Sequence, residues 1–276
     1  MEYSVLPSGA PAAPRALLIH GFATCSRQSW EGTGWVRKLH RAGIDVILMD
    51  LPYHGREFQQ DHGGNLADDS DQNVRSVHLD DENLLQATVR GMVQVLDEAA
   101  DSLGNPQHPV HLIGFSAGAR MAYEFAALLP HRTASLCLGG LPQHDELPQV
   151  RAYLQGASSE QTGESAKSSG PDGFLALQNI IDSSIISNVG LRQFAEEMPS
   201  LSFDPHSRTV QSPVLLVNGT EDTIAPSTAW LAEPLRDHGI DVHEVQLIGR
   251  DHVNALTSGQ FKKACIDWMS SHKPTD

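Results

Sequence analysis

The sequence predicts a single α/β domain with a mostly parallel central sheet and helices on both of its faces. Short apolar runs of strand character alternate along the chain with longer segments whose apolar residues recur at helical spacing. Strands separated by helices need right-handed crossovers, which place parallel strands side by side. A chain of 276 residues, of which 40% are hydrophobic, can bury one large core that carries an insertion.

The order of the elements follows from these patterns. Strands are predicted at residues 16–20, 44–50, 110–113, 134–138, 214–217 and 242–248. Helices are predicted at residues 30–42, 80–103, 119–129, 227–238 and 258–271. Two glycines, Gly32 and Gly34, weaken the first turn of the first helix, and Pro234 is expected to kink or end the fourth. Residues 56–78 are polar and aperiodic, which predicts a long surface loop.

Residues 141–206 differ from the rest of the chain, because they contain short helical segments and no clear strand. We therefore predict a helical lid at 141–206, inserted into a core formed by residues 1–140 and 207–276. The stretch 156–173 is rich in Ser and Gly, which is typical of a mobile linker. Phe174, Leu177 and Ile181 can share one helical face, which either covers the site or packs on the sheet as core.

Composition narrows the classes of function. The chain has 19 basic and 34 acidic residues, a formal net charge of −15, and no basic cluster stands out along it. Binding to nucleic acid is therefore not expected, and the acidic excess is interpreted as an aid to solubility. Neither a signal peptide nor a transmembrane helix is expected, so no membrane partner is predicted.

The cysteines indicate the compartment. Cys25, Cys137 and Cys265 are far apart in the sequence, cannot all pair within one chain, and show no metal-ligand spacing. We interpret them as the reduced thiols of a cytoplasmic protein. Asp61 and His62 could suggest a metal, but no third ligand is suitably spaced, so a surface pair is the preferred interpretation. No metal and no cofactor are predicted.

A nucleophile elbow is predicted at Gly114-Phe115-Ser116-Ala117-Gly118, where an apolar strand meets a helix without an intervening loop. In such an elbow the serine occupies a sharp, strained turn, and side chains two positions away on either side would collide. Gly114 and Gly118 remove those side chains. The N–H of Ala117 would lie at the start of the helix, where donors lack internal partners and negative charge is favoured. Gly-x-Ser-x-Gly also occurs in ordinary tight turns, so the pattern by itself does not prove the site.

Ser116 needs a base to take its proton and an acid to orient that base. Both residue types occur just past later strands, in the segments Asn218–Thr223 and Gly249–His252. Ligands of parallel sheets collect at the carboxyl ends of strands, so these segments should meet Ser116. Asp222 and His252 are the first candidates. Glu221 and Asp145 remain possible acids. Asp251 is adjacent to His252 in the sequence, but adjacency in the sequence does not make it the orienting acid.

These motifs together resemble the α/β-hydrolase fold. The resemblance rests on His20-Gly21-Phe22, on Asp50-Leu51-Pro52-Tyr53-His54-Gly55, on the elbow, and on the paired late segments. It covers about residues 16–140 and 205–271 and leaves the lid unmatched. The resemblance implies Ser116 as nucleophile, His252 as base, Asp222 as acid, and the N–H groups of Phe22 and Ala117 as the oxyanion hole. His20 and His54 are expected to orient loops through hydrogen bonds.

The resemblance implies a serine hydrolase that acts on a small-molecule carboxylic ester or thioester. The His-Gly-Gly-Gly pattern of many lipases is absent, which disfavours large hydrophobic esters, and a serine in the elbow disfavours haloalkane dehalogenases, which carry Asp there. The alternatives are an acyltransferase or perhydrolase with the same triad, or a ligand receptor of the same fold with little turnover. The natural substrate and the oligomeric state are not predicted.

Overall fold

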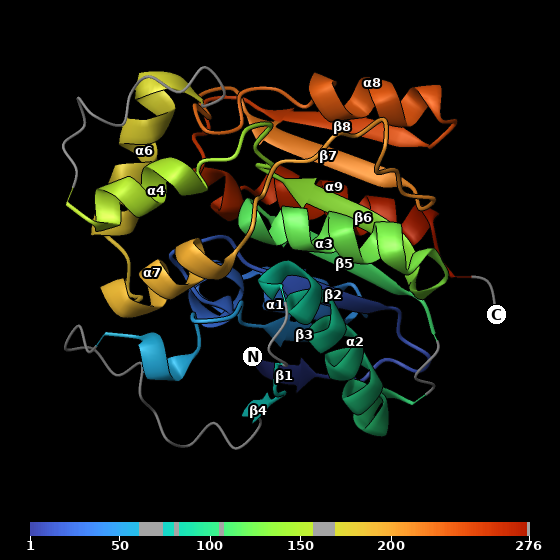
Figure 1. Ribbon diagram of the computed structural model, residues 1–276. Coiled ribbons are helices and arrows are strands. Elements are labelled where there is room, and N and C mark those ends of the chain that lie inside the picture. Colours follow the sequence, from blue (N-terminus) through green and yellow to red (C-terminus); the bar gives the residue numbers. More distant parts are fainter. Residues whose placement is uncertain (61–73, 80–82, 105–107, 157–168, 275–276) are drawn as a thin grey trace.

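The computed structural model describes residues 1–60, 74–79, 83–104, 108–156 and 169–274 (Figure 1). In this part of the chain one eight-stranded sheet has the strand order β4-β1-β3-β2-β5-β6-β7-β8. The strands are β1 (Glu2–Leu6), β2 (Arg15–Ile19), β3 (Asp45–Met49), β4 (Val74–Ser76), β5 (Val110–Phe115), β6 (Thr133–Gly139), β7 (Val214–Gly219) and β8 (Val242–Leu247). From β3 to β8 in this order, all neighbouring strands pair in parallel, and β2 and β5 lie at the centre of the sheet.

Strand β1 was not expected from the sequence. It pairs antiparallel with β3, where Tyr3 lies opposite Met49, and with β4 on its other side. Tyr3 and Val5 are buried while their neighbours are partly exposed, which is the alternation of a strand with one face against the core. The mostly parallel sheet is confirmed, and its antiparallel part is confined to one edge.

Helices cover both faces of the sheet, as predicted. On one face lie α2 (Leu84–Leu103), α3 (Ala117–Leu128) and α8 (Ala229–Asp237); on the other lie α1 (Trp35–Arg41) and α9 (Gly259–Ser271). Figure 1 shows α2 and α3 in front of the strands and α9 behind them. Asn83 begins α2 by accepting hydrogen bonds from the N–H groups of Leu85 and Gln86, which the first turn of a helix leaves without internal acceptors.

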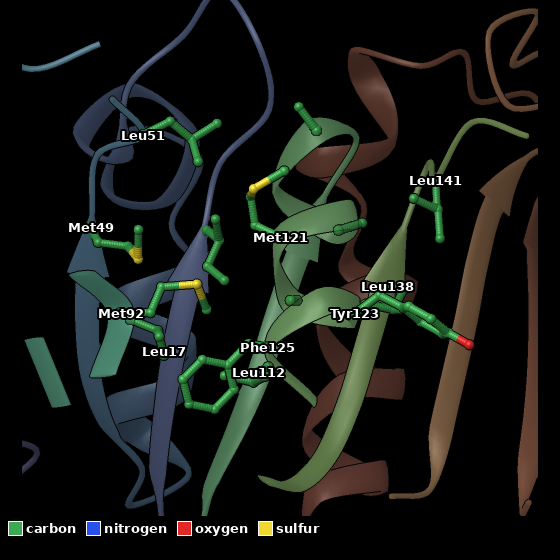
Figure 2. Close-up of a cluster of buried hydrophobic side chains, with 14 of the residues drawn as sticks. Leu17, Met49, Leu51, Met92, Leu112, Met121, Tyr123, Phe125, Leu138 and Leu141 are labelled. Atoms are coloured by element: carbon green, nitrogen blue, oxygen red, sulfur yellow. The ribbon is translucent and has the colours of Figure 1, made fainter. Parts of the chain in front are cut away.

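The core is divided by the sheet into two layers. Successive strand residues point to opposite faces, so Leu17 packs with α2 and α3 while Leu18 packs with α1 and α9. Figure 2 shows the first layer, where Phe125 of α3 lies beside Leu112 of β5. Because the central strands are buried on both faces, their nearly continuous apolar runs are those of a doubly covered parallel sheet.

The segment between β6 and β7 is helical. In its described residues it contains α4 (Leu147–Leu154), α6 (Gly170–Asp182) and α7 (Asn188–Glu197), and α4 packs against α6 and α7. Ile186 forms an isolated antiparallel bridge with Gln59. Most of the stretch 156–173 lies outside the described residues, so the mobile linker stays a prediction, as do the exact bounds of the lid.

Two predicted elements were wrong in detail. The helix expected at 30–42 is split into a π-helical turn at Arg27–Glu31 and α1, because Gly34 adopts a left-handed conformation with φ of 80°. The loop expected at 56–78 contains a 3₁₀ turn at Arg56–Phe58 and strand β4, and its residues 61–73 lie outside the described part of the chain. Pro234 lies within α8, which continues three residues beyond it.

Two further expectations can be compared with the structure. Among the described residues, no helix has both the length and the apolar character needed to cross a membrane. Cys25, Cys137 and Cys265 are buried free thiols.

Candidate active site

Ser116 occupies the turn between β5 and α3. Its backbone has φ of 53° and ψ of −120°, a conformation that costs a residue other than glycine about 1–3 kcal/mol. The Ser116 N–H donates a hydrogen bond of 2.8 Å to the carbonyl of Gly139, at the end of the neighbouring strand β6. The sheet therefore holds the strained turn in place, and this is the strain that a nucleophile elbow requires.

The glycines on either side of Ser116 are required by close contacts. A Cβ atom at Gly114 would lie 2.5 Å from the carbonyl oxygen of Gly118, which is the collision within the elbow that the sequence predicted. A Cβ atom at Gly118 would lie 2.2 Å from the carbonyl oxygen of Ile19. Gly118 thus allows the start of α3 to approach β2, so it serves the packing of the elbow against the sheet as well as the turn.

His252 and Asp222 are hydrogen-bonded. His252 Nδ1 lies 2.8 Å from Asp222 Oδ2, and both side chains are buried. The other oxygen of Asp222 accepts hydrogen bonds from the N–H groups of Ile224 and Ala225, at 3.0 and 2.8 Å. Burial alone would raise the pKa of Asp222, but the charge of His252 and these hydrogen bonds hold the pKa below its ordinary value. The carboxylate is thus ionised at neutral pH and can fix the tautomer of His252.

The loop after β2 lies against the elbow. A Cβ atom at Gly21 would lie 3.2 Å from Ser116 Cβ, so the backbone of this loop directly adjoins the serine. Ala23 follows with φ of 63°, which is unfavourable for alanine. Its N–H donates to His54 Nε2 at 3.2 Å, and its carbonyl accepts from the Ser184 hydroxyl at 2.8 Å. Hydrogen bonds on both of its peptide groups therefore hold Ala23 in this conformation.

His20 and His54 hydrogen-bond to loop backbone, which is the role expected from the sequence. His54 is fully enclosed, and burial, with a smaller contribution from His20, lowers its pKa to about 3. The neutral His54 ring donates through Nδ1 to the Pro52 carbonyl and accepts through Nε2. His20 Nε2 accepts from the Leu51 N–H at 3.0 Å, and its Nδ1 lies 2.7 Å from the Gly21 carbonyl. The two rings join the loops after β2 and β3.

A pocket of about 260 Å³ opens beside Ser116 and His252. One part of its wall is apolar and includes Phe22, Phe115, Leu177, Ile180 and Leu256. Another part carries uncharged polar side chains, namely Thr24, Gln28, Ser29, Thr33, Ser183 and Thr257. Among the described residues that line it, there is no Lys, Arg, Asp or Glu. The arrangement suits a small uncharged group placed next to a serine hydroxyl.

The model of the alpha/beta hydrolase family matches residues 16–261 of the sequence. The chain belongs to this family. No curated protein matches the sequence significantly.

Solved structures with this hydrolase fold resemble the chain over nearly its whole length. MenH from S. aureus has a TM-score of 0.67 and 15% identity, with 99% of each chain covered. The meta-cleavage product hydrolase CumD from Pseudomonas fluorescens IP01 has a TM-score of 0.65 and 14% identity, with 98% of this chain and 94% of that one covered. A thermophilic esterase from Thermogutta terrifontis has a TM-score of 0.60 and 17% identity, with 98% and 93% covered. Such low identities establish a shared fold alone.

In the described residues the His252 side chain has its hydrogen bond with Asp222, and none with the alternative acids Glu221, Asp145 and Asp251. Glu221 is exposed, and its N–H donates to the Arg250 carbonyl. Asp145 accepts hydrogen bonds from the N–H groups of Leu147 and Leu201. Asp251 accepts from the N–H groups of Val253 and Asn254, and so shapes the loop that carries His252. Asp222 is the acid that the geometry favours.

The predicted lid face is only partly in the pocket. Leu177 lines it, together with Ile180 from the same helix α6. Ile181 is buried in the core, and Phe174 packs edge-on against the Tyr153 ring at 6.3 Å. The side chains of α6 thus divide between pocket and core, so one face serves both roles. Ser184, just after α6, was not predicted at all, because nothing in the sequence connects it with Ala23.

In the part of the chain that the structure describes, no group of three His, Cys, Asp or Glu side chains is arranged so that it could hold a metal ion. The Asp61–His62 pair lies outside the described residues.

Proposed function

We propose that the protein is a serine hydrolase that cleaves a carboxylic ester or thioester through an acyl-enzyme on Ser116. The observation that carries the proposal is the His252–Asp222 hydrogen bond beside a pocket that Ser116 also lines. A hydroxyl is activated by a histidine that a carboxylate orients. Here the strained Ser116, His252 and the buried Asp222 each follow a different strand of the sheet. His252 is the proposed base, and Asp222 the residue that orients it.

The reaction would proceed in two steps. The Ser116 oxygen attacks the carbonyl carbon while His252 Nε2 takes the hydroxyl proton; the bond to the leaving group then breaks and His252 returns the proton to the leaving oxygen or sulfur. Water, activated by the same histidine, attacks the acyl-enzyme and releases a carboxylic acid together with free Ser116. Asp222 stays ionised and stabilises the imidazolium in both steps.

The oxyanion hole is proposed to consist of the N–H groups of Phe22 and Ala117. Ala117 begins α3, so its N–H has no acceptor inside the helix, and the helix dipole favours negative charge there. Phe22 follows Gly21, whose backbone adjoins Ser116. The next N–H, that of Ala23, is engaged by His54. One such donor is typically worth about 10²–10³ in kcat.

The test combines labelling and turnover. A fluorophosphonate probe is expected to label Ser116, and short p-nitrophenyl esters are expected to be hydrolysed. Ser116→Ala should abolish both, whereas Ser183→Ala, which alters another serine of the pocket wall, should be labelled normally. A Ser116→Ala variant that kept more than about a hundredth of kcat would refute the nucleophile, because loss of a triad member costs roughly 10⁴–10⁶.

The same experiment separates the alternatives. Labelling of Ser116 without turnover would favour a ligand receptor. Turnover that increases strongly when an alcohol, an amine or hydrogen peroxide is added, with the corresponding acyl product, would favour an acyltransferase or a perhydrolase.

A further inference from the structure

Helix α1 carries a cluster of unpaired positive charges. Arg37, Lys38 and Arg41 are exposed, and none of them has an ion pair in the described part of the chain. The cluster is too short to stand out in the sequence of a chain whose net charge is −15. Three unneutralised cations in a strongly acidic protein form a local site of positive potential that attracts an anion.

A surface hollow lies at this cluster. It has a volume of about 590 Å³ and is lined by Glu31, Val36, Arg37, His40 and Arg41. Two of these side chains are guanidinium groups, which bind phosphate oxygens in a bidentate manner. The size is that of a site for a small molecule rather than for a single ion.

The hollow adjoins the proposed active-site pocket. Ser29 and Thr33 line the pocket, whereas Glu31, between them in the sequence, lines the hollow. Two residues of chain span at most about 7 Å, so the two depressions lie on either side of one short segment. A Cβ atom at Gly34 would lie 3.0 Å from Arg37 Nη2, so this guanidinium lies beside Gly34, the residue that follows the pocket-lining Thr33.

Lys262 connects the positive cluster to the pocket wall. Its ammonium donates hydrogen bonds of 2.7 and 3.1 Å to the carbonyls of Thr33 and Thr257, both of which line the pocket. Burial lowers the pKa of Lys262, and the nearby charges of Lys38 and Arg37 lower it further. The cations of α1 are therefore close enough to act electrostatically on this wall.

The two depressions suit two different parts of one substrate. The described pocket wall carries no Lys or Arg, so an anionic group buried there would lose its hydration without gaining a counter-charge. The hollow outside offers the counter-charges. We propose that the substrate is a thioester between a short uncharged acyl group and a phosphate-bearing carrier of the coenzyme A type, with its phosphates on Arg37 and Arg41. This inference rests on the proposed hydrolase function.

The chemistry is that of the proposed mechanism with sulfur as the leaving atom. Ser116 Oγ forms a bond to the acyl carbon, the C–S bond breaks, and His252 gives the proton it took from Ser116 to the departing sulfur. The carrier leaves as a free thiol, and water then releases the acyl group as a carboxylic acid. The phosphates stay outside the reacting centre and contribute to binding.

The test compares two thioesters with the same acyl group. Butyryl-coenzyme A carries the phosphates, and S-butyryl-N-acetylcysteamine lacks them. In Arg37→Gln/Arg41→Gln, the ratio of kcat/KM for the first thioester to kcat/KM for the second is expected to fall about five-fold or more, mainly through KM. Arg90→Gln, which removes an exposed cation of α2, is the matched control and should leave the ratio unchanged. Raising the salt concentration from 50 to about 200 mM should lower the ratio in the native protein more than in the double variant.

The outcomes separate this inference from the function it rests on. If the native protein hydrolyses S-butyryl-N-acetylcysteamine but the double variant keeps the native ratio, the phosphate site is refuted and the hydrolase stands. An equal fall in Arg90→Gln would also refute the site, because net charge alone would then explain it. If neither thioester nor any p-nitrophenyl ester is hydrolysed, the proposed function itself fails.

Discussion

Ser184→Ala is expected to impair catalysis without touching the proposed catalytic residues. The Ser184 hydroxyl donates to the carbonyl of Ala23 and accepts a hydrogen bond of 2.9 Å from the Ile186 N–H. It lies just after α6, so it connects the helical segment to the loop after β2. Removal of the hydroxyl leaves the carbonyl of Ala23 without this partner, in a residue whose φ of 63° is already unfavourable.

The magnitude follows from these contacts. Ser184 is buried, and each lost hydrogen bond of this kind costs about 0.5–1.5 kcal/mol, so the free energy of unfolding should fall by about 1–3 kcal/mol. In a chain of this size that lowers Tm by roughly 2–4 °C per kcal/mol. Loss of a whole oxyanion donor costs about 10²–10³ in kcat, so a displaced Phe22 N–H should reduce kcat by about ten-fold. KM should change little, because the pocket wall is intact.

The assay measures kcat, KM and Tm on a short p-nitrophenyl ester at a temperature well below both melting points. Ser183→Ala is the control, since that neighbouring hydroxyl donates to carbonyls of its own helix, those of Asn179 and Ile180. The control should keep kcat. A Ser184→Ala protein with lowered Tm and unchanged kcat would show that the hydroxyl stabilises the fold alone, and the argument for the loop would be wrong.

Three further outcomes are expected. Asp222→Asn should lower kcat by about 10⁴ and the exposed Glu221→Gln by far less; the reverse ranking would make Glu221 the acid. Burial lowers the pKa of His54 to about 3 and, with the charges of His272 and His108, that of His111 to about 4. In the unfolded chain both rings become protonated below about pH 6.5, whereas in the folded protein they stay neutral to a lower pH. The free energy of unfolding should therefore fall as the pH drops below about 6.5, by up to about 1.4 kcal/mol per pH unit for each ring. Equal urea midpoints at pH 7 and pH 5 would contradict this. Leu177→Ala should shift kcat/KM toward longer acyl chains, and an unchanged chain-length profile would place Leu177 outside the acyl-binding part of the pocket.

The fold could be predicted because each central strand is buried on both faces and therefore forms a nearly continuous apolar run, as in the Val46–Met49 part of β3. Strand β1 was not predicted from the sequence, because only two of its residues, Tyr3 and Val5, are buried and because prolines follow it. Likewise, the left-handed conformation of Gly34 divides the expected helix into two pieces, which the apolar spacing alone did not indicate. Sequence patterns identify helices and strands that have a strong periodic signal. Strands near the edge of a sheet and breaks within a helix lack such a signal.

The candidate site was partly predictable for a different reason. Ser116, Asp222 and His252 each follow a strand, and parallel strands bring their carboxyl ends to one edge of the sheet. No comparable rule places Ser184 on Ala23, because their contact depends on how the helical segment folds back over that edge. The cations of α1 became significant only when the structure showed the hollow beside them.

The pairing of β5 with β2 has a consequence for the order of folding. The turn at Ser116 is formed by adjacent residues of β5 and α3, which meet through local contacts. One of the two sheet neighbours of β5 is β2, where Ile19 lies opposite Gly114, and pairings between such distant parts of a chain form slowly. The loop carrying Phe22 reaches the serine only through that pairing. An incompletely folded chain therefore carries the turn at Ser116 without the backbone of that loop beside it.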